Sequence, residues 1–292
     1  MQHQKYADLL KDYLELTKLR VTILVALTVV AGYYLGAEGQ INGWILLNTV
    51  IGTMLVAGGS SALNQVLEIE IDAKMKRTMR RPLPSGRISP LHAQLFGIFI
   101  SVAGILHLTF FINPLTGMLS ALTLVSYVFF YTPMKRKSSL STLIGAIPGA
   151  LPPVGGWAAA RGDIGFEAWL LFAILFLWQI PHFLAIAWIY REDYARGGLK
   201  VLTVTDEQGF STVRHIVANT VALLVVSLLP TIVGLSGKLY FVGAVLLGVL
   251  FLLSAFRVAS QRSNKSAKNL LLTSVLYLPA LFFLMSFDKT WL

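Results

Sequence analysis

Long apolar stretches alternate with short polar segments along this chain. A helix needs about 20 apolar residues to cross the hydrocarbon core of a bilayer, and we expect spans near residues 21–35, 44–63, 95–112, 115–131, 140–160, 168–190, 216–234, 239–256 and 270–287. The fifth has the weakest pattern because it contains Pro148, Pro152 and Pro153, which membrane helices tolerate where neighbours satisfy the freed backbone groups. The pattern predicts an all-α, polytopic membrane protein, a bundle of nine transmembrane helices in one domain over residues 1–292.

The composition excludes most other classes of protein. Hydrophobic residues make up 55% of the 292 and charged residues only 13%, whereas a soluble domain averages about 25% charged residues. The sequence has no cysteine, so disulfide scaffolds, thiolate metal sites and cysteine nucleophiles are impossible.

The basic residues indicate the orientation in the membrane. The net charge is +10, and 21 of the 24 Lys and Arg residues fall before the first predicted span or in alternate loops; the exceptions are Arg161, Lys238 and Lys289. Positive loops stay on the cytoplasmic side, so we expect residues 1–15 to form a cytoplasmic flank and the C-terminus to lie outside a bacterial or archaeal cell membrane. Short basic clusters between apolar stretches favour membrane lipid, and not nucleic acid, as the surroundings.

An acidic row follows the second predicted span. Asn64, Glu68 and Asp72 have the spacing i, i+4, i+8, which places them on one face of a helix. Two carboxylates about 6 Å apart repel each other by roughly 3 kcal/mol at an effective dielectric of 20, so a bound cation, a basic neighbour or protonation must offset the repulsion. A sparse set of oxygen ligands suits Mg²⁺, which completes its shell with water and phosphate oxygens.

A basic cluster follows within nine residues of Asp72, comprising Lys76, Arg77, Arg80 and Arg81. By itself it resembles an ordinary positive-inside loop. Together with the acidic row it suggests a diphosphate site, in which carboxylates hold a divalent ion and guanidinium groups contact phosphate oxygens.

Further candidates lie in other segments. Glu192 and Asp193 form a second acidic pair at the end of the sixth span, although isolated acids of this kind are more often surface charges. Tyr131 and Lys135 belong to a patch that an ordinary positive-inside loop explains equally well. His182 lies inside the sixth span, where a histidine is commonly a packing residue.

These residues belong to stretches that resemble the intramembrane aromatic prenyltransferase superfamily, and within it the protohaem IX farnesyltransferase (haem O synthase) branch. The resemblance rests on Leu16–Thr22, the Asn64–Arg87 segment, Tyr131–Thr132 with Lys135–Arg136, Ile144–Ala150, Trp178–Phe183 and Asp193–Tyr194. It extends in detail from about residue 14 to 210.

The resemblance implies a nine-helix bundle around a central cavity and a Mg²⁺-dependent reaction. Farnesyl diphosphate would donate a farnesyl group to a vinyl group of haem B, and water would supply the hydroxyl of haem O. The implied ligands of Mg²⁺ are Asn64, Glu68, Asp72 and Asp193. The implied diphosphate contacts are Arg77, Arg81, Lys135, Tyr131, Lys76 and Arg20, and His182 is the implied haem contact.

The match also has departures and implied partners. Glu68 stands where the family usually has Asp, a change that keeps the charge and moves it by about one methylene, and Lys200 and Thr203 stand where prolines are common. A haem A synthase or haem–copper oxidase assembly factors are the implied protein partners.

Two other functions remain open from the sequence. The same chemistry could act on a quinone-precursor ring or another lipid acceptor. A transporter could use the carboxylates as an ion pathway, although the sequence shows no inverted repeat and the acids lie at span ends.

Overall fold

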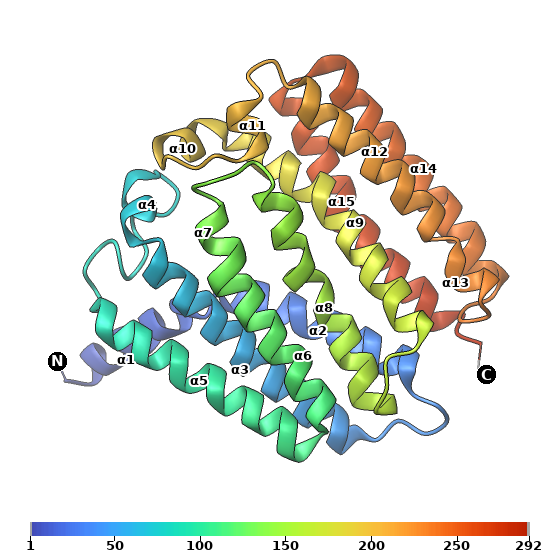
Figure 1. Ribbon diagram of the computed structural model, residues 1–292, viewed down its shortest axis with the longest axis horizontal. Helices are drawn as coiled ribbons and strands as arrows, with labels where there is room; N and C mark the ends of the chain where they lie inside the picture. Colours follow the sequence, from blue (N-terminus) through green and yellow to red (C-terminus); the bar gives the residue numbers. More distant parts are fainter. Residues whose placement is uncertain (1, 291–292) are drawn as a thin grey trace.

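The protein is a bundle of long helices, described by a computed structural model over residues 2–290, with side chains from residue 8 (Figure 1). The long helices are α2 (Leu19–Gly36), α3 (Gly43–Leu67), α5 (Pro90–Phe111), α6 (Pro114–Val125), α8 (Ser141–Arg161), α9 (Phe166–Ile189), α12 (Phe210–Val226), α14 (Lys238–Gln261) and α15 (Asn264–Phe287). Amphipathic α1 (Gln2–Leu16) precedes them.

Short helices fill the turns between the long ones. They are α4 (Ile69–Lys74), α7 (Thr132–Met134), α10 (Arg191–Arg196), α11 (Leu202–Thr205) and α13 (Leu229–Ile232), and a π-helical segment, η1 (Ser126–Tyr131), joins α6 to α7. Figure 1 shows α4, α7, α10 and α11 at one end of the bundle, which we call the α4–α10 end.

The nine predicted spans are confirmed within residues 2–290. Nine helical stretches are long and apolar enough to cross a membrane, the fourth running through α6, η1 and α7 and the seventh through α12 and α13. Many large apolar side chains point outward, among them Phe99, Phe110 and Leu276, each more than 70% exposed. An apolar outer surface on so many spans is the surface of an integral, multi-pass membrane protein.

Small residues let several helices approach closely. A Cβ on Gly59 of α3 would lie 2.0 Å from Ser101 Oγ of α5, and one on Gly156 of α8 would lie 2.1 Å from the Val29 carbonyl oxygen of α2. Without a hydrophobic driving force between helices in lipid, such close backbone packing is a main source of association.

The proline-rich fifth span is a continuous helix, α8. The Gln179 side chain of α9 donates hydrogen bonds to the Ala146 carbonyl at 3.3 Å and to the Leu175 carbonyl at 3.1 Å. Asn113 donates to the Ala158 carbonyl at 2.9 Å. Polar side chains of Gln179 and Asn113 therefore tie α8 to its neighbours at Ala146 and Ala158.

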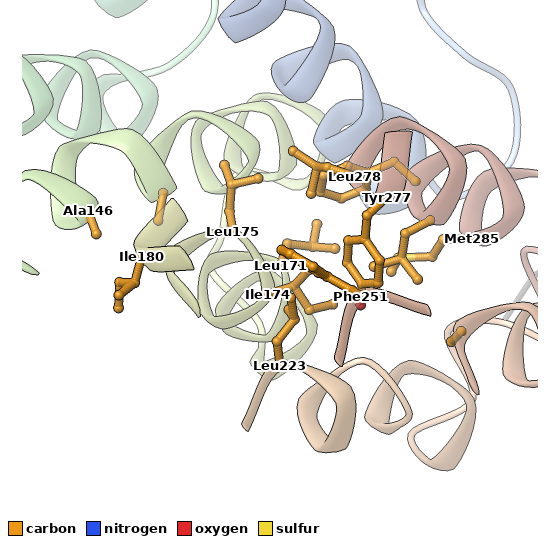
Figure 2. Close-up of a cluster of buried hydrophobic side chains, with 14 of the residues drawn as sticks. Ala146, Leu171, Ile174, Leu175, Ile180, Leu223, Phe251, Tyr277, Leu278 and Met285 are labelled. Atoms are coloured by element: carbon orange, nitrogen blue, oxygen red, sulfur yellow. The ribbon is translucent and has the colours of Figure 1, made fainter. Parts of the chain in front are cut away.

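The main core lies where α8, α9, α12, α14 and α15 meet. Figure 2 shows Leu171 and Ile174 of α9 packed with Phe251 and Tyr277. A separate apolar cluster at the α4–α10 end contains Ile71, Met75, Ala187, Leu199 and Val201. This second cluster joins the segment after α3 to the segment after α9, and it brings the two acidic regions of the sequence to the same end of the molecule.

Candidate active site

The acidic row lies at the junction of α3 and α4. The helix is interrupted at Glu68, which has φ −110° and ψ 14°, so the three residues do not share one regular helix as the spacing predicted. Helical spacing nevertheless persists, because the Glu68 N–H donates to the Asn64 carbonyl at 3.1 Å and the Asp72 N–H to the Glu68 carbonyl at 2.8 Å. All three side chains are buried, with Asn64 1%, Glu68 6% and Asp72 1% exposed.

Asn64 and Glu68 are joined in a chain of polar contacts. The Asn64 amide donates to Glu68 Oε2 at 3.0 Å and to the Thr132 hydroxyl at 3.1 Å. Lys135 Nζ lies 3.0 Å from Glu68 Oε1 and lies over the Tyr131 ring, 4.6 Å from its centroid. The site therefore assembles two distant regions of the chain, the end of α3 and the η1–α7 corner.

The η1–α7 corner owes its geometry to a local change of helix type. The π-helical turn at Ser126–Tyr131 is closed by the Thr132 hydroxyl, which donates to the Tyr127 carbonyl at 2.9 Å. Such wide turns are rare and often mark functional sites. Here the turn places Tyr131 and Thr132 beside the acidic row.

Asp72 is paired with Arg81 through a 2.6 Å contact from Arg81 Nη1 to Asp72 Oδ2. The Thr78 hydroxyl donates to the Asp72 backbone carbonyl at 2.9 Å, which holds the intervening turn. The other carboxylate oxygen, Asp72 Oδ1, is buried and has no hydrogen-bond partner among the residues that the structure describes. A buried, partnerless anionic oxygen is costly, and a cation at this position would remove the cost.

Lys18 completes the site, although it was not among the predicted site residues. Its Nζ donates to Asn64 Oδ1 at 3.0 Å. Burial, with the nearby Arg81 and Lys135 charges, lowers the Lys18 pKa to about 7, against the opposing effect of Glu68 and Asp72. Arg20, the cation predicted from this stretch to contact the diphosphate, is exposed. Only the turn at Lys18, where φ is 49°, shows which of the two cations faces inward.

Lys135 keeps its charge at the site. Burial works against the charged form, but Tyr131 and the Glu68 carboxylate outweigh it and the net effect raises the pKa of Lys135. Glu68 and Asp72 thus face Lys135 and Arg81 at close range, and the cations that would contact phosphates are already at the acidic row.

Asp193 is at the same end of the bundle but has a different set of partners. Its carboxylate accepts hydrogen bonds from the backbone N–H groups of Lys76 at 3.1 Å and Arg77 at 3.2 Å, and from the Arg196 side chain. Burial opposes its charge, yet these hydrogen bonds hold the pKa of Asp193 below its usual value. In this structure Asp193 fixes the backbone of the basic segment.

The described side chains contain no group of three or more His, Asp or Glu residues arranged to share a metal ion. The structure therefore does not gather Glu68, Asp72 and Asp193 into one ready-made cage. The fit to Mg²⁺ rests on Asp72 Oδ1 and the Glu68 oxygens, which are hard oxygen donors of the type that this ion prefers.

The other predicted phosphate contacts are spread around the acidic row. Arg77 lies over the Tyr190 ring, 5.3 Å from its centroid, and Lys76 is exposed. A cavity of about 450 Å³ opens beside Glu68 and is lined by Leu67, Glu68, Ile71, Thr132, Pro133, Arg136 and Lys137. Thr132, Arg136 and Lys137 were not among the predicted site residues, although they belong to the same patch as Tyr131 and Lys135.

His182 lies apart from these charges, seven residues before the end of α9. Its ring stacks on Trp178 with centroids 4.6 Å apart and contacts Ser274 of α15. The structure thus separates a charged region at the α4–α10 end from a histidine inside the bundle.

Comparison with known proteins places the chain in a family. The model of the UbiA prenyltransferase family matches residues 25–286. A protoheme IX farnesyltransferase of Solibacter usitatus is 50% identical over 96% of this chain and 99% of its own length. One of Koribacter versatilis is 43% identical over 97% and 95% of the two chains.

Solved structures share the fold at low sequence identity. A chain from a study of digeranylgeranylglyceryl phosphate synthase in membranes superposes with a TM-score of 0.81 at 18% identity, covering 96% of this chain and 98% of that one. A UbiA homologue from Archaeoglobus fulgidus, bound to DMAPP and Mg²⁺, gives a TM-score of 0.69 at 14% identity, covering 94% and 99%. By sequence and by fold, this chain belongs to the UbiA prenyltransferase family.

Proposed function

We propose that this protein transfers a farnesyl group from farnesyl diphosphate to a vinyl carbon of haem B, with addition of water, giving haem O and diphosphate. The observation that carries the proposal is the buried row of Asn64, Glu68 and Asp72 faced by Lys135 and Arg81. The protoheme IX farnesyltransferase names of relatives up to 50% identical over nearly the full length support the haem acceptor.

Glu68 and Asp72 would hold Mg²⁺, with the Asn64 amide oxygen available once Lys18 turns away. The metal, when bound, supplies positive charge that stabilises the leaving diphosphate. Asp193 would join this ligand set only by giving up its hydrogen bonds to the Lys76 and Arg77 backbone.

Binding of the metal and the diphosphate would exchange the ionic partners of the two carboxylates. Without substrate, Lys135 neutralises Glu68 and Arg81 neutralises Asp72. When the carboxylates turn to a metal, both cations are released within reach of phosphate oxygens, and Arg77, Lys76, Tyr131 and Lys18 lie around the same region. No buried charge is then left without a partner, which would otherwise cost several kcal/mol.

The chemistry requires stabilisation of charge more than a strong base. Ionisation of the allylic C–O bond leaves its electron pair on diphosphate, where the cations stabilise it. The farnesyl cation forms a C–C bond with the terminal vinyl carbon, and the new cation beside the porphyrin ring takes up water and loses a proton. The apolar interior keeps water away from the first cation.

His182 lies deeper in the bundle than the charged residues of the site. Seven residues of α-helix rise about 10 Å, so His182 lies about that far inside the bundle from the α9 end that carries Asp193. Because the vinyl carbon must reach C1 of the donor, beside the diphosphate, an acceptor held near His182 would have to extend from His182 toward the α4–α10 end.

A direct assay tests the proposal. Purified protein is incubated with farnesyl diphosphate and Mg²⁺, with either haem B or a quinone-precursor ring as acceptor, and products are identified by mass. We expect haem B to gain one farnesyl group and one hydroxyl group, and we expect a chelator to stop the reaction. Unmodified haem together with a prenylated ring would contradict the haem assignment, and product formation unaffected by chelator would contradict the metal.

A further inference from the structure

His182 is held in one orientation by α15. Its Nδ1 lies 2.8 Å from the Ser274 hydroxyl oxygen. Trp178, on which the imidazole stacks, donates its indole N–H to the backbone carbonyl of Ser274 at 2.8 Å. Two side chains of α9 therefore converge on one residue of α15.

The Ser274 hydroxyl determines which nitrogen of His182 carries the proton. It donates to the Leu271 carbonyl at 2.6 Å, and a hydroxyl has only one hydrogen to give. At the 2.8 Å contact with His182 the serine oxygen must then accept. Nδ1 is consequently the protonated nitrogen, and in the neutral ring Nε2 carries a free lone pair.

The lone pair on Nε2 has no hydrogen-bond partner among the described side chains. Unlike Nε2 of His107, which is sealed inside the protein, Nε2 of His182 is not completely enclosed. An unpaired acceptor at this depth in a membrane helix is unfavourable, so the arrangement points to a ligand that the nitrogen can bind.

We propose that Ser274 is a positioning residue that keeps the proton of His182 on Nδ1, so that Nε2 coordinates the iron of the porphyrin acceptor. The identity of the acceptor rests on the proposed function. A histidine that donates one ring N–H to an acceptor and offers the other nitrogen to a metal is the usual arrangement at metal sites. Iron coordination would orient the porphyrin, and Ser274 would act only through His182.

The tautomer is measured without any substrate. Nitrogen NMR of protein labelled with ¹⁵N-histidine distinguishes a protonated from an unprotonated ring nitrogen, and the His182→Gln spectrum identifies the His182 signals. We expect a neutral His182 with its proton on Nδ1 in the wild type and a mixture of tautomers in Ser274→Ala. A wild-type proton on Nε2, or an unchanged pattern in Ser274→Ala, would overturn the role of Ser274.

Iron coordination is measured by the absorption spectrum of bound ferric haem. We expect a Soret shift in the wild type that is absent in His182→Gly, returns with added imidazole, and persists in His107→Gln. Ser274→Ala should weaken haem binding about tenfold, as for other residues that support a metal ligand. Ser274→Thr keeps the hydroxyl and should bind haem as tightly as the wild type. A haem spectrum unaffected by the loss of His182 would overturn the coordination.

A packing control separates this role from a structural one. Trp178→Phe removes the other hydrogen bond to Ser274 and keeps a ring on His182, so it should lower thermal stability and leave the tautomer unchanged. The proposal would be contradicted if the proton left Nδ1 of His182 in Trp178→Phe but stayed there in Ser274→Ala. Coordination by His182 in a protein that makes no farnesylated haem would refute the proposed function and leave this inference standing.

Discussion

At the scale of single residues, the site is defined by the ion-pair and hydrogen-bond partners of each buried carboxylate. Glu68 is paired with Lys135, and Asp72 is paired with Arg81 through one oxygen, while its other oxygen has no partner within the described part of the chain. Asp193 is fully engaged with backbone N–H groups and Arg196. The oxygen most available to a metal therefore belongs to Asp72.

Replacing Asp72 by Asn tests this ranking. Asp72→Asn keeps the shape and removes the charge, so we expect farnesyl transfer to fall by about 100-fold or more, as when a stabilising group for the leaving charge is lost. The matched control is Glu70→Gln, an exposed acid in the same short helix. Equal activities of the two variants would contradict a metal role for Asp72.

The choice between Lys18 and Arg20 could not be predicted from the sequence. Both are cations in the stretch before the first span, and nothing in the spacing says which faces the site. The left-handed conformation at Lys18 turns its ammonium toward Asn64. The hydrophobic pattern does not predict such a turn at a non-glycine residue, because this conformation is uncommon there.

Lys18→Met should therefore weaken binding of the prenyl diphosphate. We expect its KM to rise about tenfold, the effect of one charge-assisted hydrogen bond worth roughly 1.5 kcal/mol, while the KM for haem stays constant. Lys11→Met, a change to an exposed cation of α1, serves as the control. A haem KM that rises in parallel would show that Lys18 supports the fold and not the diphosphate.

At the scale of elements, the sequence predicted the nine spans because apolar runs of bilayer length have few other interpretations. It predicted the acidic row as one helical face, whereas the structure breaks the helix at Glu68. It could not predict that Asp193 would cap the Lys76–Arg77 backbone, since that contact joins residues 116 or 117 positions apart. Loop-to-loop contacts of this kind have no periodic signal.

Asp193→Ala distinguishes support of the basic segment from metal binding. Loss of the hydrogen bonds should free the backbone at Lys76 and Arg77, so trypsin should cleave there faster while the Mg²⁺ dependence of the reaction stays the same. Glu192→Ala, an adjacent exposed acid, should change neither. A higher Mg²⁺ requirement in Asp193→Ala without faster cleavage would instead assign Asp193 to the metal.

Two adjacent glycines of α8 test the packing of α2 against α8. Gly156→Ala would place a methyl group 2.1 Å from the Val29 carbonyl oxygen, whereas a Cβ on Gly155 meets nothing within 4 Å. We expect Gly156→Ala to lower the free energy of unfolding by about 1–3 kcal/mol through overpacking, measured by thermal or denaturant unfolding in detergent. Gly155→Ala should be neutral or stabilising, and equal effects would contradict the packing.

At the scale of the whole molecule, the predicted class is confirmed, as is the number of spans over residues 2–290, and the family is established from the sequence of nearly the entire chain. The orientation in the membrane remains a prediction from the distribution of basic residues. The site required the fold, because the α3 end meets Lys18 and Lys135, and Asp193 meets the Lys76–Arg77 backbone, only when these segments are brought to one end of the bundle.

The absence of cysteine makes the orientation simple to measure. Single cysteines are introduced at Gln261, at the α4–α10 end, and at Asp163, between α8 and α9; both residues are exposed. A membrane-impermeant maleimide should label Asp163→Cys in intact cells and Gln261→Cys only after permeabilisation, as the positive-inside rule requires. The reverse labelling would invert the predicted topology.

The central claim is that Glu68 and Asp72 bind diphosphate through a divalent ion. Binding of a non-hydrolysable farnesyl thiodiphosphate to the purified protein, measured by calorimetry with and without Mg²⁺, tests it most directly. We predict tight binding to the wild type that needs Mg²⁺ and is lost in the Glu68→Gln/Asp72→Asn double variant. Equal binding without Mg²⁺, or an unchanged affinity in the double variant, would contradict the claim.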